Sequence, residues 1–323
     1  YDIGVINGVL LFITRDIPMD DVQIGLIVGA ILIPSAIAIV ITGKLADWFG
    51  RKKMLIVSAI VFLISVWMLV EANTYHMVLY SRWLQGLAVG VITIVVPLYL
   101  AETIPTHLRG RGVGLFQLFL TAGILLGTMA NYLLAGTKDW RLMFATAAIP
   151  AIILLIGAFF LPNSPRWLLL KGKKDKALKV LSLMNPFNIA LQECEHICEV
   201  IEADNKKLGK SWNQFFVALT KRQFLIPFLI VISVSILNQT TGINSILQFV
   251  AVIIANSGAS KGTSALIGAN IITGFNFLIT IVALFLVDKL GRKVLLGCGT
   301  GLIVVSLVYT GFIYLLVPAG SLK

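Results

Sequence analysis

Long apolar segments separated by short connections constrain this chain more than any other feature. Each suits a membrane-spanning helix, which needs about 20 residues. Eight of them lie at residues 22–43, 54–72, 77–101, 112–135, 141–161, 223–255, 264–287 and 294–317. A ninth, residues 1–14, is shorter. Only 13% of the residues are charged, against about 25% in soluble domains, so the sequence predicts an all-α, polytopic membrane protein.

The pattern Asp-x-x-Gly-Arg-Lys occurs twice, at 47–52 and at 288–293, and joins two apolar segments each time. Such a repeat is typical of transporters built from two related helix bundles. It predicts two six-helix pseudo-repeats, with nine of twelve expected helices present and three more expected after Lys323. We divide the chain into an N-terminal six-helix bundle with a truncated first helix (1–161), a cytoplasmic linker with short amphipathic helices (162–222), and the first three helices of a C-terminal bundle (223–323).

Positive charge gathers in alternate connections. The net charge is +11, and 20 of the 26 Lys and Arg residues lie in the connections 44–53, 105–113, 162–222 and 288–293. Membrane proteins keep such basic connections on the cytoplasmic side. The charge therefore indicates orientation and contact with membrane lipids rather than nucleic acid. We expect a multi-pass protein of the plasma membrane or inner cell membrane.

Motifs of other function classes are missing from the printed sequence. It has no Gly-x-x-x-x-Gly-Lys-Ser/Thr phosphate loop, no nucleophile–base pair and no metal cluster, so we expect neither an enzyme nor an ATP-driven pump, and no cofactor. Cys194 and Cys198 flank His196, but without a fourth ligand we do not expect a metal site.

Several motifs resemble the sugar porter branch of the major facilitator superfamily. They lie at residues 1–8, at Arg82 with Gly86 and Gly90, at 97–102 with Arg109-Gly110, at 162–168 and at 239–244. The resemblance covers the whole chain. It implies a major facilitator fold that carries a monosaccharide or polyol by alternating access. The chain departs from the family pattern at Asn163, Asn238, Gln248 and Phe249.

Polar side chains recur along three of the predicted membrane helices. An amide offers both a donor and an acceptor, which suits a sugar hydroxyl, whereas Ser, Thr and Asn also bond membrane helices to one another. One helix face carries Gln117, Thr121, Ile124, Thr128 and Asn131, since they are spaced three and four residues apart. We expect most Ser and Thr residues to join helices. With the resemblance, the candidate substrate-binding residues are Gln117, Ile124, Asn238, Gln239, Asn244 and Asn276.

Asp2 and Arg82 are ionisable residues in predicted membrane helices. A charge at the bilayer centre costs about 2.5–3.5 kcal/mol or more, so such residues normally face a cavity and find a partner. The resemblance associates an aspartate at the first of these positions with proton coupling, and we assign that role to Asp2 and Arg82. The alternatives are a static salt bridge, a facilitative sugar uniporter, or a non-transporting sugar sensor on the same scaffold.

Charged residues at the cytoplasmic helix ends form a third group. We predict that they make a latch which closes the inside when the transporter faces out: Asp47, Arg51, Glu102, Arg109, Arg166, Asp288 and Arg292. The alternative is a set of basic loops that only determines topology. Gly242 either lets the seventh helix bend or serves close helix packing, which we also expect at Gly25, Gly29, Gly123 and Gly127.

Overall fold

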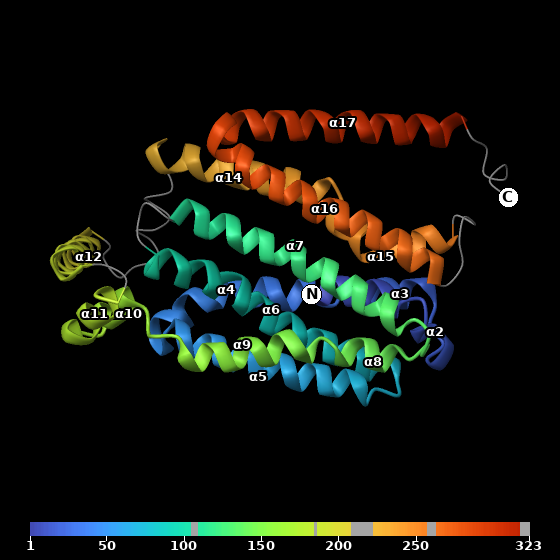
Figure 1. Ribbon diagram of the computed structural model, residues 1–323, viewed down its shortest axis with the longest axis horizontal. Coiled ribbons are helices and arrows are strands. Elements are labelled where there is room, and N and C mark those ends of the chain that lie inside the picture. Colours follow the sequence, from blue (N-terminus) through green and yellow to red (C-terminus); the bar gives the residue numbers. More distant parts are fainter. Residues whose placement is uncertain (105–108, 184–185, 208–221, 257–262, 317–323) are drawn as a thin grey trace.

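The computed structural model describes residues 1–104, 109–183, 186–207, 222–256 and 263–316 (Figure 1). Every regular element in these ranges is an α-helix, as the sequence predicts. Six helical stretches among them are long and apolar enough to cross a membrane: Asp21–Phe49, Arg51–Val70, Tyr75–Thr103, Gly114–Leu134, Trp140–Phe160 and Thr263–Val287.

The first half begins with the shorter helices and continues with the long ones. Its elements are α1 (Asp2–Val9), α2 (Ile13–Asp16), α3 (Asp21–Gly29), α4 (Leu32–Phe49), α5 (Arg51–Val70), α6 (Tyr75–Thr103), α7 (Arg109–Leu134), α8 (Trp140–Ala145) and α9 (Ala148–Phe160). Side-chain caps at Asp20, Thr74 and Asp139 begin α3, α6 and α8, because they satisfy free backbone N–H groups there. Gly50, with φ +90°, separates α4 from α5 within the repeated motif.

The linker helices lie together beyond one end of the bundle (Figure 1). They are α10 (Pro165–Leu170), α11 (Lys174–Leu181) and α12 (Phe187–Lys207). The Ser164 hydroxyl caps α10, and Pro165 occupies the first turn, where its missing N–H does no harm. The predicted linker continues to residue 222, and its part from 208 to 221 lies outside the described residues.

The second half contains α14 (Arg222–Thr240), α15 (Ile243–Asn256), α16 (Thr263–Leu290) and α17 (Arg292–Leu316). The predicted segment 223–255 is therefore two helices. Gly242 separates them with φ +71°, a conformation that glycine adopts without strain. A Cβ at Gly242 would meet no atom of the described residues within 4 Å. The glycine thus serves the bend and not close packing.

Glycines bring α6 and α7 close to their neighbours. A Cβ at Gly86 or Gly90 would lie 2.5 Å from a backbone oxygen of the α4 region, and one at Gly127 would lie 2.5 Å from the Tyr1 carbonyl. The expectation for Gly25 and Gly29 is not met within the part of the chain that the structure describes, where a Cβ at either would meet nothing within 4 Å. Where α6 approaches α4, its polar residues Ser81, Arg82 and Gln85 are buried.

Candidate functional site

Asp2 of α1 and Arg82 of α6 meet in the interior of the first half. Arg82 Nη1 donates to Asp2 Oδ1 at 2.9 Å and to Oδ2 at 3.0 Å. The Arg82 side chain is 1% exposed and that of Asp2 is 11% exposed. The same nitrogen donates to Gln85 Oε1 at 2.8 Å. The two residues named from the sequence thus form one buried ion pair, while their role in proton coupling remains a prediction.

The candidate amides of the second half are divided by the bend at Gly242. Asn244 Nδ2 donates to Gln239 Oε1 at 2.9 Å, so these two side chains join the end of α14 to the start of α15. Both are exposed, and Asn276 on α16 is half-buried. The Asn238 side chain lies outside the described residues.

Two residues on the polar face of α7 bond to other helices, whereas Thr121 bonds to the carbonyls of Gln117 and Leu118 in its own helix. Thr128 Oγ1 lies 3.0 Å from Thr273 Oγ1 of α16. Asn131 Nδ2 donates to the carbonyls of Gly4 and Val5 at 2.9 and 3.0 Å. These bonds agree with the helix-joining role expected for the threonines and extend it to Asn131.

The same α7 face carries two of the candidate substrate-binding residues. The Gln117 side chain is exposed, whereas Ile124 is buried. Gln117 thus lies on the exposed part of this face, nearer the start of α7.

Asn7 joins the two halves and was not singled out from the sequence. Its side chain is 1% exposed. Asn7 Nδ2 donates to the Leu247 carbonyl at 3.1 Å, and Oδ1 accepts from the Ala251 N–H at 2.8 Å. These two backbone groups are four residues apart in α15, so they are the pair that an uninterrupted helix bonds together. The Asn7 amide thus bonds to both backbone groups of one helical turn of α15.

Arg51 is the centre of the cytoplasmic cluster. Its side chain is 3% exposed and pairs with Asp47 at 2.9 Å and with Glu102 at 2.7 Å. Nη1 also donates to the Ala46 carbonyl at 3.0 Å. The exposed fractions of the two carboxylates differ greatly, with 57% for Asp47 and 5% for Glu102. The buried Arg51–Glu102 pair is therefore screened far less by water than the Arg51–Asp47 pair.

The start of the linker is bound to this cluster. Ser164 Oγ donates to Glu102 Oε2 at 2.5 Å, and Trp167 Nε1 donates to the Asp47 carbonyl at 3.2 Å. The Trp167 ring also lies against Gly50, where a Cβ would be 2.9 Å from it. Ser164 and Trp167 were quoted within the 162–168 motif but not chosen as site residues.

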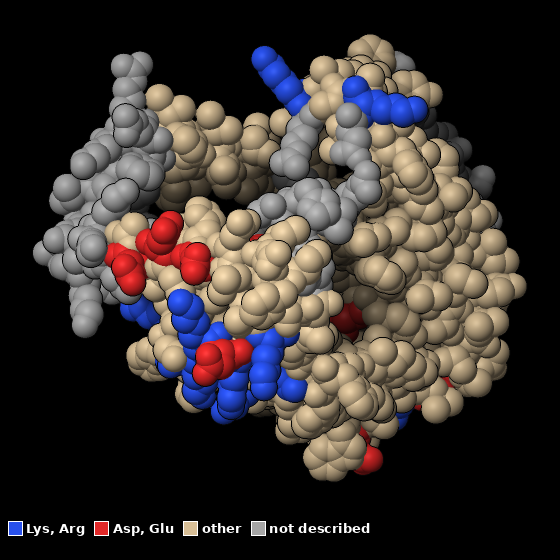
Figure 2. Space-filling model, turned by 60° about the vertical axis from the view of Figure 1, so that its left-hand side comes forward, with Lys and Arg blue, Asp and Glu red and all other residues tan. Residues whose placement is uncertain are grey.

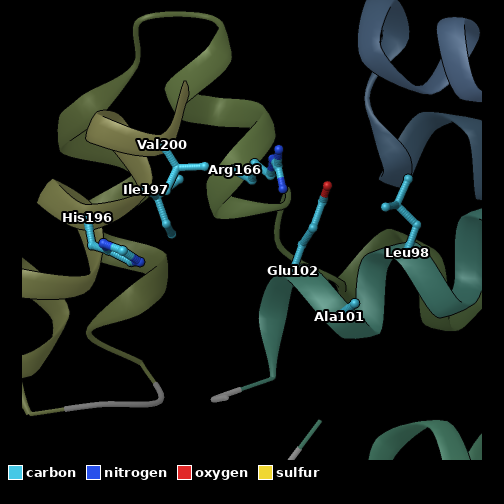
Figure 3. A pocket seen from close by; sticks show the side chains of 7 residues that line it. All are labelled: Leu98, Ala101, Glu102, Arg166, His196, Ile197 and Val200. Carbon is cyan, nitrogen blue, oxygen red and sulfur yellow. The ribbon is translucent and has the colours of Figure 1, made fainter. Parts of the chain in front are cut away.

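A cavity of about 280 Å³ lies between α6, α10 and α12. Its lining consists of Leu98, Ala101, Glu102, Arg166, His196, Ile197 and Val200. Figure 3 shows the Glu102 and Arg166 side chains pointing toward one another across it. Arg166 thus lines the same cavity as Glu102, and its part in the latch stays a prediction. The side chains of Arg109, Asp288 and Arg292 lie outside the described residues, and their part in the latch stays a prediction.

The end of the molecule that carries α10–α12 is rich in charged side chains. Figure 2 shows Lys and Arg gathered there, with Asp and Glu beside them. This is the end that the charge pattern places in the cytoplasm.

A second charged cluster lies at the opposite helix ends. Asp16 Oδ2 accepts from Trp140 Nε1 at 2.8 Å and from Arg141 Nη1 at 2.9 Å. Arg141 Nη2 also donates to the Ala72 carbonyl at 2.9 Å, and the guanidinium lies 4.4 Å from the Trp140 ring centroid. The cluster ties three connections of the first half together. The hydrogen bond from Trp140, and then the one from Arg141, lowers the pKa of Asp16 below its ordinary value of 3.8.

The lowered pKa of Asp16 predicts that the folded protein loses stability in acid. Because the ionised form of Asp16 is favoured in the folded protein, its contribution to stability is present above pH 3.8 and is lost as the pH falls through the lowered pKa. Asp16→Asn should reduce the loss of thermal stability on acidification below that value. Melting temperatures in detergent at a series of pH values measure this, with Asp175→Asn on the exposed face of α11 as control. Identical pH profiles for the parent and Asp16→Asn would contradict the prediction.

Comparison with known proteins identifies the family. Residues 1–322 match the family model described as Sugar (and other) transporter. The chain is 37% identical over 325 residues to the putative metabolite transport protein YwtG of Bacillus subtilis (strain 168), covering 99% of this chain and 69% of YwtG. It is 36% identical over 323 residues to the glucose transporter GlcP of Staphylococcus epidermidis (strain ATCC 12228 / FDA PCI 1200), covering 99% and 70%.

The fold matches a solved transporter structure. A partially occluded, inward-open conformation of the xylose transporter XylE from E. coli superposes with a TM-score of 0.76 at 25% identity, covering 91% of this chain and 70% of XylE. The chain thus spans about 70% of the length of each of these relatives. It belongs to the sugar transporter family of the major facilitator superfamily, whose members are integral, multi-pass membrane transporters and not enzymes.

Proposed function

We propose that the protein is a secondary transporter that moves a monosaccharide or polyol across the membrane by alternating access, coupled to protons. The observation that carries this proposal is the Asp2–Arg82 pair, with its distance of 2.9 Å and its burial within the membrane bundle. A buried carboxylate is a group that can take up and release a proton. XylE, which the chain resembles, is described as a proton:xylose symporter.

The proposed sugar site and the proposed proton site are carried by different helices. The candidate sugar-binding side chains, on α7, α14, α15 and α16, are Gln117, Ile124, Asn238, Gln239, Asn244 and Asn276. Asp2 lies on α1 and Arg82 on α6. Helix α7 packs against α1, because a Cβ at Gly4 would clash with the Ile124 carbonyl. This contact supports coupling in which a movement of α1 reaches the candidate face of α7.

Alternating access is supported by the kind of contact that joins the halves. Asn7 bonds to the Leu247 carbonyl and the Ala251 N–H of α15. If Asn7 withdraws, those two backbone groups can bond to each other, so separation of α1 from α15 leaves only the Asn7 amide in need of a new partner. Alternating access needs two states that differ by no more than a few kcal/mol.

Uptake by the full-length protein in proteoliposomes tests the proposal. Radiolabelled glucose, xylose and myo-inositol would be supplied with and without an inward proton gradient. Accumulation above the external concentration only with the gradient is the expected result. Uptake that stops at equal concentrations would indicate a uniporter, and binding without uptake would indicate a sensor.

The proposed sugar site predicts weaker binding for three substitutions. Gln117→Ala, Gln239→Ala and Asn276→Ala should each raise the dissociation constant roughly 2- to 100-fold, since a lost hydrogen bond costs about 0.5–3 kcal/mol depending on what is left unpaired. Equilibrium binding of the transported sugar measures this. Gln192→Ala, an exposed amide on α12, is the control. Unchanged affinity in all three folded variants would place the site on another face.

A further inference from the structure

Gln85 is a fully buried amide beside the ion pair. Its side chain is 0% exposed, and it lies one helical turn after Arg82 on α6. Its Oε1 accepts from Arg82 Nη1 at 2.8 Å, and the same nitrogen donates to both oxygens of Asp2. The Arg82 guanidinium is therefore shared between an acceptor on another helix and an acceptor on its own helix.

The surroundings of Arg82 are poor in acceptors. Arg82 Nε and Gln85 Nε2 are buried, and neither has a hydrogen-bond partner among the described residues. The Arg82 guanidinium also lies over the face of the Phe144 ring, with its carbon 5.8 Å from the ring centroid. The face of an aromatic ring attracts a cation. A cation in a membrane interior needs such partners, so the loss of one acceptor has a large effect here.

Other charged groups of the packed helices lie apart from this pair, as far as the structure describes them. Arg141 of α8 pairs with Asp16 at one end of the bundle, and Arg51 of α5 pairs with Glu102 at the other. Asp2 is therefore the counter-charge of Arg82 in the described structure.

We propose that Gln85 is a positioning residue that holds the Arg82 guanidinium while Asp2 carries a proton. The inference rests on the proposed proton coupling. When a proton from outside binds an Asp2 oxygen, the carboxylate becomes a neutral carboxyl and its attraction for Arg82 weakens. Helix α1 can then move away from α6, whereas Gln85 stays beside Arg82 because both belong to α6. The guanidinium remains in place to meet Asp2 again once the proton has left toward the cytoplasm.

A thermal double-mutant cycle tests the acceptor role without transport. Gln85→Met keeps a similar side-chain length but removes the amide oxygen. Its decrease in melting temperature should be larger in an Asp2→Ala background than in the parent, because Arg82 then loses both acceptors. The Asp2→Asn background, which retains an amide oxygen, should give an intermediate decrease. Equal decreases in all three backgrounds would show that Gln85 only fills space, and would overturn the inference.

A transport measurement on the full-length protein in proteoliposomes tests the functional role. Gln85→Met should lower proton-driven accumulation of the transported sugar about tenfold, the usual scale for losing a hydrogen bond to a charged group. Sugar exchange without a gradient should stay within about twofold of the parent. The control is Ser81→Ala, which removes another buried side-chain hydrogen bond on α6, to the Met77 carbonyl, and should preserve both activities.

The outcomes separate the two proposals. Parent-like accumulation by Gln85→Met, or equal loss of accumulation and exchange in folded protein, would overturn the role of Gln85 while leaving proton coupling in place. A parent protein that never accumulates sugar with a proton gradient would overturn the proposed coupling, and the role of Gln85 in it would fall as well.

Discussion

Asp2→Asn is expected to abolish proton-driven accumulation of sugar while sugar exchange continues. The asparagine amide does not bind a proton at physiological pH, but it keeps the size of the side chain and an oxygen that Arg82 Nη1, 2.9 Å from Asp2 Oδ1, can still reach. The candidate sugar residues lie on other helices. The measurement is uptake of radiolabelled sugar into proteoliposomes with and without an inward proton gradient, followed by exchange at equal sugar concentrations.

A matched variant makes this result specific. Asp21→Asn removes an exposed carboxylate at the start of α3, so it should leave both accumulation and exchange unchanged. If Asp2→Asn still concentrates sugar against its gradient, Asp2 is not the proton carrier, and the Asp2–Arg82 pair serves only to tie α1 to α6.

Glu102→Gln should destabilise the protein more than Asp47→Asn. Both residues pair with Arg51, but the Arg51 and Glu102 side chains are only 3% and 5% exposed. Removing one partner of a buried pair costs about 3–5 kcal/mol, because the other charge remains buried. We expect about 3 kcal/mol for Glu102→Gln, since the amide oxygen still accepts a hydrogen bond. Asp47 is 57% exposed, and exposed pairs contribute about 1 kcal/mol or less.

Chemical unfolding in detergent measures this difference, with Asp47→Asn as the matched control. Equal losses of unfolding free energy in the two variants would contradict the assignment of Glu102 as the principal partner. The proposed latch adds a second readout. With the three native cysteines replaced by alanine, a cysteine introduced by Ala101→Cys, at the cavity beside Glu102, should be labelled faster from the cytoplasmic side when Glu102 is Gln. Unchanged labelling would favour basic loops that only determine topology.

Composition and the lengths of the apolar segments were sufficient to predict the all-α membrane class, and the resemblance of several motifs identified the family. Lipid cannot satisfy backbone hydrogen bonds, so a spanning segment must be a helix of about 20 apolar residues, and that requirement is visible in a single sequence. Ionisable residues are rare inside such segments because burying their charge in lipid costs free energy, so the few that occur stand out in the sequence. Asp2 and Arg82 could therefore be paired in advance, and the structure brings them to 2.9 Å.

Other features depended on which helices approach one another. Asn131 and Gln117 share one predicted face of α7, yet Asn131 bonds to the Gly4 carbonyl of α1 while Gln117 is exposed. A helical period determines the face of a residue but not the neighbour that the face meets. The hydrogen bonds of Asn7 to α15, one of them to Leu247 at a separation of 240 residues, have no local signal for the same reason.

The relative importance of Asp47 and Glu102 was likewise decided by packing. The repeated motif drew attention to Asp47, which the structure leaves 57% exposed, while Glu102 is enclosed by Arg51 and by Ser164 of the linker. The strength of an ion pair depends on how much water its neighbours exclude. The amount of water excluded depends on how the helices assemble. Gln85 is one amide in a long apolar run, and only the three-dimensional structure connects it with Arg82 and Asp2.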